Sequence, residues 1–476
     1  MKKHSLFKFM SILLLVILVI TQFLPGRTGE IARLPLWDVM TNYLQSYYYF
    51  FDTAVFMLVI GAFYGVLNKT GAYKKLLDSI VLKVKTKGKI FVFAIAIVLA
   101  LLSSLTGLTI PLLIFIPFIV SIILLLGYDK LVAISSTVVS ILIGFIGGIF
   151  VNFRDANSYY GYYASTFDKL CGIDRYTNLI PQIILLVLGL TLLILFINRH
   201  IKEVEKKKVK YDLNDNSELL VTEVKGNYKD IKSWPLVIIF SLIIILLILG
   251  LIPWSSLFEI ELFNEFHTWL TELNIKGYPI FNGLISTVFP AFGVWAELGA
   301  NMMSMVLLLT SLIIIKFIYR IKFDDLLNDM VEGAKKMLPT AMLMMMAYCV
   351  LVCTYNNGFI ETLISKASEG GDINFVVASL ISGIGSILHV DIYYTVLGVF
   401  TPIIGAVADE SLYNVYAIAF QSLYGFVNTF GPTSLLLVFV LSYLDVPYTT
   451  WLKYIWRFVL SLFIIIFAIL LIIALI

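Results

Sequence analysis

Long apolar runs decide what this chain can fold into. Of its 476 residues, 60% are hydrophobic and only 14% are charged. Several apolar stretches reach the roughly 20 residues that a membrane-spanning helix needs. Soluble domains carry about a quarter charged residues. The composition therefore predicts an all-α polytopic membrane protein that has the lipid bilayer as its surroundings, and the net charge of +3 indicates no nucleic-acid partner.

Motifs for ATP or metal chemistry do not occur in the sequence. There is no glycine-rich phosphate loop, no Walker motif and no metal-ligand cluster, which argues against an ATP-driven pump and a metalloenzyme. A membrane-embedded enzyme is a further alternative, but the chain has no convincing pair of nucleophile and base. We therefore expect no enzyme and no cofactor, apart from a coupling ion such as H⁺ or Na⁺.

The distribution of basic residues predicts the orientation of the chain in the membrane. Lys2, Lys3 and Lys8 flank the start of the first apolar run, Phe9–Leu24. We interpret this run as a retained helix with a cytoplasmic N-terminus and not as a signal peptide. The basic loop 198–233 is predicted to be cytoplasmic for the same reason. These features predict a multi-pass protein of the plasma membrane.

Two parts of the chain share weak sequence similarity but carry opposite loop charge. Asn68-Lys69-Thr70-Gly71 resembles Tyr355-Asn356-Asn357-Gly358, yet a basic stretch follows the first and an acidic stretch follows the second. Gly144-Phe145 recurs as Gly425-Phe426. Related halves whose loop charges are opposite predict inverted-topology repeats with broken or re-entrant helices.

The stretch Phe420–Ser434 is the strongest candidate for a binding site. Its polar side chains surround Gly431-Pro432, and a lipid-facing helix has no use for them because unpaired polar groups in hydrocarbon cost several kcal/mol. The Gly-Pro break frees backbone groups that can bind a ligand. The alternative is a Pro-kinked helix packed by small residues. The candidate residues are Gln421, Ser422, Asn428, Thr429, Thr433 and Ser434.

By symmetry, other polar breaks are expected to face this stretch. They are Ser103–Thr109, Ile143–Asn157 and His389–Thr395. Half-helix N-termini there would offer N–H groups to an anion, and freed carbonyls would coordinate a cation. These breaks add Ser103, Ser104, Thr106, Gly148, Asn152 and Asp391 to the substrate-binding candidates.

Four ionisable residues at or near membrane depth are candidates for coupling transport to an ion or a proton. Asp391 would face a cationic amine or carry a proton, and His389 would titrate near neutral pH. The alternative places both residues at the membrane surface. The other two candidates are Asp155, for which a solvated helix end is the favoured interpretation, and Glu297.

Several separated blocks of sequence resemble one known family, the YfcC-type C4-dicarboxylate anaerobic carriers of the ion transporter superfamily. The blocks include VFMLVIGAFYGVLNKTGA (Val55–Ala72), YNNGFIETLI (Tyr355–Ile364), TPIIGAVAD (Thr401–Asp409) and FQSLYGFVNTFGPTS (Phe420–Ser434). The family includes basic amino-acid antiporter-like members. The resemblance implies an elevator-type secondary transporter with a scaffold region, a transport region containing two hairpins, and a homodimeric assembly.

The sequence departs from the family pattern where the substrate would bind. Asp391-Ile392-Tyr393-Tyr394 replaces a serine-rich tip, and Ile110-Pro111 stands where the family usually has acidic residues. The Asn-Pro signature near Gly148–Asn152 is missing. A changed binding tip can change the ligand while the fold persists. Asp391 in place of serine favours a cationic group.

These features predict a secondary active transporter for a small charged organic solute, most simply an amino acid that is basic and exchanged by antiport. Alternative substrates are a C4-dicarboxylate or a peptide. A channel or a non-transporting membrane scaffold is the alternative from another class, although the polar residues cluster at helix breaks and form no continuous pore.

The expected division of the chain has five parts. They are an N-terminal helix and external segment (1–49), a first repeat (50–178), a span and cytoplasmic linker (179–233), scaffold spans (234–334), and a second repeat with the C-terminal helix (335–476).

Overall fold

The computed structural model describes residues 5–23, 33–149, 177–206, 230–252, 254–255, 259–281, 292–293, 295 and 300–475. Within these residues, eight helical segments are long and apolar enough to cross a membrane. The fold is therefore that of an all-α polytopic membrane protein, as the composition predicts. The eight segments are Ser5–Phe23, Leu36–Lys69, Ala72–Thr106, Leu179–Glu205, Trp234–Leu251, Asn301–Ile318, Phe323–Asn356 and Tyr448–Ala474.

The first part of the chain alternates long helices with short, interrupted ones. Its α-helices are α1 (Ser5–Phe23), α2 (Leu36–Lys69), α3 (Ala72–Val84), α4 (Gly88–Thr106), α5 (Ile116–Leu125), α6 (Lys130–Ile134), α7 (Ser140–Ile146) and α9 (Leu179–Glu205). Two 3₁₀ turns, η1 (Lys85–Lys87) and η2 (Ile110–Phe115), and one π-helical turn, η3 (Ser135–Val139), lie between them.

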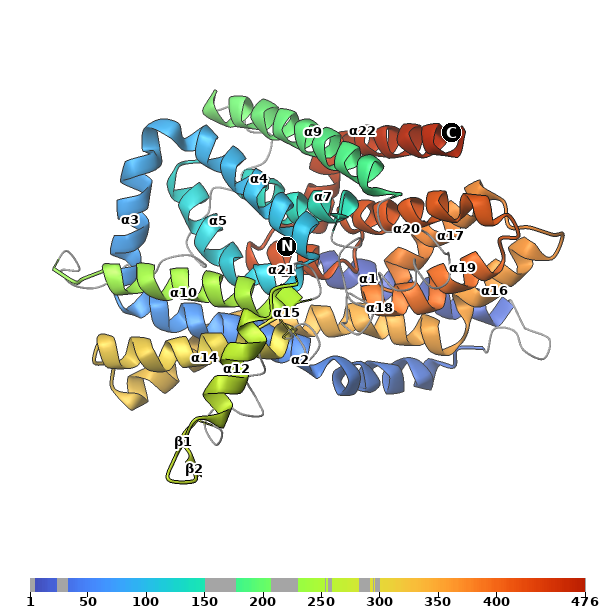
Figure 1. The fold of residues 1–476 in the computed structure, drawn as a ribbon. Helices are drawn as coiled ribbons and strands as arrows, with labels where there is room; N and C mark the ends of the chain where they lie inside the picture. The colour runs from blue at the N-terminus through green and yellow to red at the C-terminus, as the bar shows by residue number, and fades with distance from the viewer. Residues whose placement is uncertain are drawn as a thin grey trace.

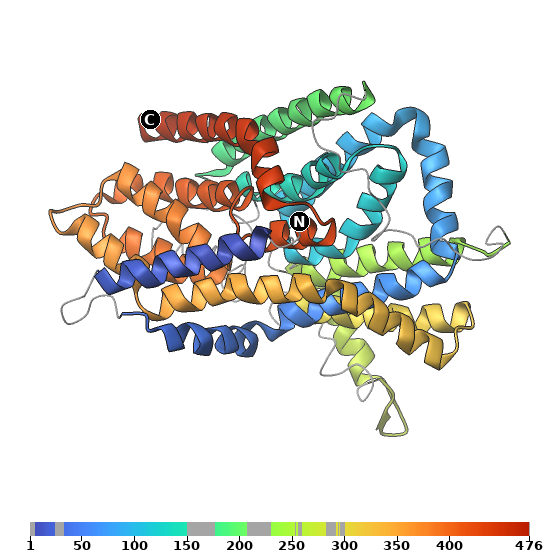
Figure 2. The same ribbon diagram turned by 180° about the vertical axis from the view of Figure 1, so that it is seen from behind.

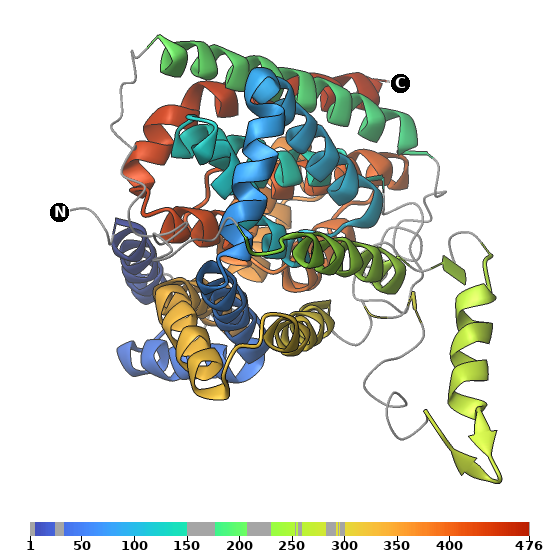
Figure 3. The same ribbon diagram turned by 90° about the vertical axis from the view of Figure 1, so that its left-hand side faces the viewer.

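The middle of the chain contains α10 (Trp234–Leu251), α12 (Leu262–Glu272) and α14 (Ala300–Ile318). Between α12 and α14, strands β1 (Asn274–Ile275) and β2 (Tyr278–Pro279) form an antiparallel hairpin in which Ile275 pairs with Tyr278. Helix α12 and this hairpin project away from the body of the protein, as Figure 3 shows.

The last part repeats the alternation of the first. Its helices are α15 (Phe323–Asn356), α16 (Phe359–Ser368), α17 (Phe375–Leu388), α18 (Ile392–Thr395), α19 (Thr401–Gly405), α20 (Tyr413–Asn428), α21 (Leu435–Tyr443) and α22 (Tyr448–Leu475), with a π-helical turn η5 (Val396–Phe400) and a 3₁₀ turn η6 (Glu410–Leu412). Both α2 and α15 have 34 residues, and each is followed by a glycine with positive φ, Gly71 at 66° and Gly358 at 64°.

The helices form layers. Helices α2, α14 and α15 lie on one side, α9 and α22 lie together on the opposite side, and the interrupted helices α4, α7, α17 and α20 lie between them (Figure 1). Two helix groups can be named from this arrangement. The outer group consists of α2, α10, α14 and α15, and the inner group consists of α4, α5, α7, α17, α20 and α21.

Helices α2 and α15 pack against each other in antiparallel directions along most of their length. Near one end the Nδ2 of Asn42 contacts the Sγ of Cys353 at 3.4 Å. Further along, a Cβ placed on Gly333 would lie 2.1 Å from the carbonyl oxygen of Gly61. Only glycine permits this approach, which matches the use of small residues where membrane helices cross closely.

This packing corrects the helix boundaries that hydropathy suggests. From hydropathy we expected the apolar segment after the first run to extend over Thr53–Leu67 and the second half to begin at about Leu338, but α2 begins at Leu36 and α15 begins at Phe323. Two expected domain boundaries, after residues 49 and 334, therefore fall inside helices. The polar starts of α2 and α15 belong to the helices because each extends the other's packing surface.

A buried hydrogen-bonded pair joins the end of α9 to the start of α6. Asp129 accepts the N–H of Val132 at 2.9 Å as the N-cap of α6, and its Oδ2 lies 2.8 Å from the Nε2 of His200. Asp129 is 1% exposed and His200 is 7% exposed. The pair fixes α9 against the inner group, because a buried carboxylate needs its partners.

Glycine at position 333 is expected to be indispensable for folding. Gly333→Ala should destabilise the protein by about 1–3 kcal/mol or more, because the added methyl group overpacks a backbone contact. Gly370→Ala is the matched control, since nothing lies within 4 Å of its added Cβ. Thermal unfolding monitored by size-exclusion chromatography in detergent measures both variants. An unchanged melting temperature for Gly333→Ala would contradict the helix crossing.

Loss of the His200 side chain should also lower stability. His200→Ala leaves the Asp129 carboxylate buried without this partner, which costs about 3–5 kcal/mol. The control is Glu203→Gln, because Glu203 is 53% exposed and lies 3.8 Å from the other ring nitrogen. An exposed pair of this kind contributes about 1 kcal/mol or less. Equal shifts in melting temperature for the two variants would rule out a special role for the buried pair.

Candidate functional site

A small cleft of about 60 Å³ lies where four interrupted segments of the inner group meet. They correspond to the four polar helix breaks that the sequence analysis predicted to face one another, within the residues that the structure describes. The lining residues are Thr109, Ile110, Leu142, Phe145, Val390, Asp391, Ile392, Tyr424, Asn428, Ser434, Leu435 and Leu436.

The N-terminus of α21 forms one wall of this cleft. The chain turns at Gly431-Pro432, and Ser434 precedes the helix as its N-cap residue. The first N–H groups of a helix have no acceptor within it, and here they follow Ser434 directly. The Ser434 hydroxyl is buried and has no hydrogen-bond partner in the structure. N–H groups, a free hydroxyl and the positive end of the helix dipole together favour an anion.

Helix α20 is fixed to the tip of the second hairpin, between α17 and α18. The hydroxyl of Tyr424 donates to the carbonyl of Val390 at 2.8 Å, and the Nδ2 of Asn428 donates to the carbonyl of Tyr424 at 2.8 Å. The Thr433 hydroxyl donates to the carbonyl of Ile387 at the end of α17. These bonds hold the break before α21 against the hairpin tip.

Asp391 is the one carboxylate among the described lining residues, which include no Lys or Arg. It is the N-cap of α18, and its Oδ1 accepts the N–H of Tyr393 at 2.9 Å. An acidic N-cap satisfies a free N–H group and interacts favourably with the helix dipole. The residue therefore has a structural role that does not require a cationic ligand.

His389 is buried within the protein, with 1% of its surface exposed. Its ring meets the edge of Tyr355 at a centroid distance of 5.7 Å and packs over Gly398, where an added Cβ would lie 2.9 Å from the ring. Neither ring nitrogen has a hydrogen-bond partner in the structure. His389 adjoins the cleft but does not line it.

Several polar candidates satisfy the backbone of a broken helix and do not face the cleft. The Nε2 of Gln421 donates to the carbonyls of Gly148 at 2.8 Å and Phe145 at 3.2 Å, and its Oε1 accepts from the Nε2 of Gln182 at 3.0 Å. The Ser104 hydroxyl donates to the carbonyl of Gly147 at 2.7 Å. These carbonyls belong to the end of α7, which has no water to satisfy it in a membrane.

Other candidates bond to their own helices. Ser422 donates to the carbonyl of Ile418 at 2.6 Å, Thr429 donates to that of Phe426 at 2.7 Å, and Thr106 donates to that of Leu102. The Ser103 hydroxyl is buried without a partner in the structure, but Ser103 does not line the cleft. Asn152, Asp155 and Glu297 lie outside the described residues.

Two contributors were not predicted. Tyr424 lies in the cleft and could have been found, because it is three residues after Gln421 and four before Asn428, which is the spacing of one helix face. Gln182 supports the cleft from α9. Its signal is an amide side chain within the apolar run that forms the first part of α9.

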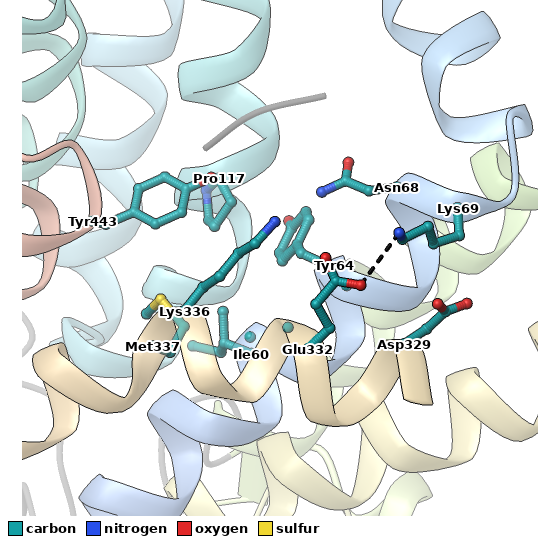
Figure 4. A pocket seen from close by; sticks show the side chains of 13 residues that line it. Ile60, Tyr64, Asn68, Lys69, Pro117, Asp329, Glu332, Lys336, Met337 and Tyr443 are labelled. Atoms are coloured by element: carbon teal, nitrogen blue, oxygen red, sulfur yellow. Dashed lines mark ion pairs between the residues drawn. The ribbon is translucent and has the colours of Figure 1, made fainter. Parts of the chain in front are cut away.

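A second cleft, of about 30 Å³, is lined by charged side chains (Figure 4). It lies where α2 crosses α15 and is also bordered by Pro117 and Tyr443 of the inner group. The Nζ of Lys69 lies 3.2 Å from the Oε2 of Glu332, and both side chains are about half exposed. Such a pair contributes about 1 kcal/mol or less to stability. Lys336 extends into the same cleft without an ion pair in the structure.

Comparison with known proteins adds the family. The model of the DcuC family of C4-dicarboxylate anaerobic carriers matches residues 24–475. An uncharacterised protein of Haemophilus influenzae is 32% identical over 85 residues, which are 18% of this chain and 17% of that protein. No solved structure matches. Because the family model covers nearly the whole length, the chain belongs to the C4-dicarboxylate anaerobic carriers, a family of membrane transporters.

Proposed function

We propose that this protein is a secondary carrier for a C4-dicarboxylate and that one substrate carboxylate binds at the N-terminus of α21. The observation that carries this proposal is the buried, unpartnered hydroxyl of Ser434 beside the free N–H groups of the helix, in the cleft between the interrupted segments. A carboxylate satisfies both kinds of donor. The family match supports a transporter with a substrate of this class.

This proposal replaces the basic amino acid that we preferred from the sequence. That preference rested on Asp391, but the Asp391 carboxylate already caps α18 through the N–H of Tyr393. The family match favours the dicarboxylate that we kept as an alternative. Antiport of a basic amino acid has no further support.

Asp391 also bears on the coupling ion. A substrate carboxylate about 5 Å from an ionised Asp391 would be repelled by about 3 kcal/mol at an effective dielectric constant of about 20. A bound cation, H⁺ or Na⁺, removes most of this cost. We therefore propose that the substrate and a cation occupy the cleft together, which makes the carrier a symporter for that cation.

We also propose that the two halves are inverted repeats and that transport proceeds by an elevator movement of the inner group past the outer group. The antiparallel arrangement of α2 and α15 supports an inversion, as do the matching order of elements and the opposite loop charges. The homodimer and the cytoplasmic position of the N-terminus and of loop 198–233 in a plasma membrane belong to the same proposal.

Removal of the Ser434 hydroxyl should weaken substrate binding. A hydrogen bond to a charged group contributes about 1.5–3 kcal/mol, so Ser434→Ala should raise the KM for succinate by about 10- to 100-fold. Folding should be unaffected, because the hydroxyl makes no capping bond. Uptake of labelled succinate into proteoliposomes measures the effect.

Ser422→Ala is the matched control for this experiment. A hydroxyl is likewise removed from the adjacent helix, where it bonds to the carbonyls of Ile418 and Ala419 in that helix. Its KM for succinate should stay within about twofold of the wild-type value. If Ser434→Ala keeps the wild-type KM, the anion site is not at the start of α21.

The variant Asp391→Asn distinguishes the hypothesis of a dicarboxylate substrate from that of a basic amino-acid substrate. Asparagine can still cap α18 through its carbonyl oxygen, but it carries no charge. For a dicarboxylate, succinate should bind at least as tightly as to the wild type, while its uptake should lose its dependence on a Na⁺ or H⁺ gradient. Arginine uptake that is present in the wild type and lost in this variant would instead restore the amino-acid hypothesis.

A cross-link between the two helix groups tests the elevator movement. The hydroxyl of Thr340 in α15 donates to that of Ser442 in α21 at 2.9 Å. In a protein whose native cysteines are replaced by alanine, Thr340→Cys with Ser442→Cys should form a disulfide that reduces succinate uptake more than tenfold, and reduction should restore it. Thr340→Cys alone is the control. Full uptake with complete cross-linking would exclude a sliding movement at this contact.

A further inference from the structure

An open groove of about 490 Å³ lies between α1, α15 and the end of α21. Figure 2 shows α1 lying alongside α15 at the periphery of the protein. Most of the groove is apolar. Its lining includes Leu6 and Phe7 from α1, Leu338, Met342 and Leu343 from α15, and Leu441 and Val446 from the inner group.

Lys336 lines this groove as well as the charged cleft of Figure 4. Glu332 stands four residues before it, which is the spacing at which glutamate and lysine pair within a helix. Glu332 instead binds Lys69 of α2 at 3.2 Å. The ammonium group of Lys336 is thereby left without an ion pair in the structure. Asp445, the one acid among the described lining residues, is engaged in an interaction of its own.

The position of Lys336 in α15 places it at the level of lipid headgroups. The rest of the helix, Met337–Asn356, contains no charged residue. Lysines at the end of such a stretch lie at the membrane–water boundary. The groove extends from Lys336 along the uncharged part of α15, past Leu338 and Met342. The charged Lys336 thus lies next to the apolar part of the groove.

We propose that this groove is a binding site for an anionic phospholipid, with the phosphate on Lys336 and an acyl chain along Leu338, Met342 and Phe7. Charge selects the lipid, because a lysine near the bilayer surface attracts anionic headgroups. A helix of another protein would fill the apolar part but would not neutralise Lys336.

The bound lipid contacts both helix groups. Lys336 and Met342 belong to the outer group, whereas Leu441 lies in the inner group's α21 and Val446 follows that helix. If the groups slide past each other, as the proposed function holds, the lipid would influence the rate of that movement. Lipid binding itself does not rest on the proposed function.

Native mass spectrometry of the purified protein tests the site directly. Protein in detergent is titrated with phosphatidylglycerol or phosphatidylcholine, and the bound lipid is counted. The wild type should retain phosphatidylglycerol at least fivefold more strongly than phosphatidylcholine. Lys336→Gln should lose this preference. Lys335→Gln removes the same charge one residue earlier, outside the groove lining, and should keep it.

A second variant covers the apolar part of the site. Met342→Trp should fill the groove and reduce retention of both lipids while Lys336 remains. Equal retention of the two lipids by the wild type would overturn the proposal. A loss of preference in Lys335→Gln as large as that in Lys336→Gln would also overturn it, because the effect would then be one of general surface charge. Succinate transport is measured separately, so failure of the carrier function would leave these results unaffected.

Discussion

Backbone hydrogen bonding inside the membrane is the constraint on which this structure depends. Each interrupted helix leaves N–H or C=O groups that no water can satisfy. Gln421 and Ser104 supply donors to the end of α7, and Thr433 supplies one to the end of α17. The start of α21 receives no such partner beyond the free hydroxyl of Ser434. The hydrogen-bond donors at the start of α21 therefore lack protein acceptors, and because they lie in the cleft a ligand can bind to them.

The same constraint explains why a polar residue in an apolar chain is an ambiguous signal. Ser422, Thr429 and Thr106 each bond to a carbonyl of their own helix, which lets a hydroxyl be buried at little cost. Gln421 is a polar residue near a helix break, as expected of a ligand-binding residue, yet its amide group bonds to the end of α7 and to Gln182 of α9. These residues differ from Ser434 in that their side chains make hydrogen bonds within the protein, whereas the Ser434 hydroxyl makes none.

The packing of α2 against α15 has a consequence for charge. The glycine contact between Gly61 and Gly333 brings the two helices so close that Glu332 can reach Lys69. Glu332 is thereby withdrawn from Lys336, its natural partner within α15. A tight backbone contact thus leaves Lys336 without an ion pair among the described residues, beside an apolar groove between the two helix groups.

The sequence by itself determined the class of fold and the existence of the helix breaks. Apolar runs and the Gly431-Pro432 dipeptide are local features, and local features can be recognised from the order of residues alone. The family likewise follows from blocks of sequence in a given order.

Only the tertiary structure decided the extent of α2 and α15 and the roles of the polar residues. Hydropathy places the start of α2 at Thr53, but contacts with α15 extend it to Leu36. Asp391 suggested a cationic substrate until its carboxylate was found to cap α18. The physical reason is the same in both cases. Whether a polar group is available depends on which partners are brought to it by segments far away in the chain.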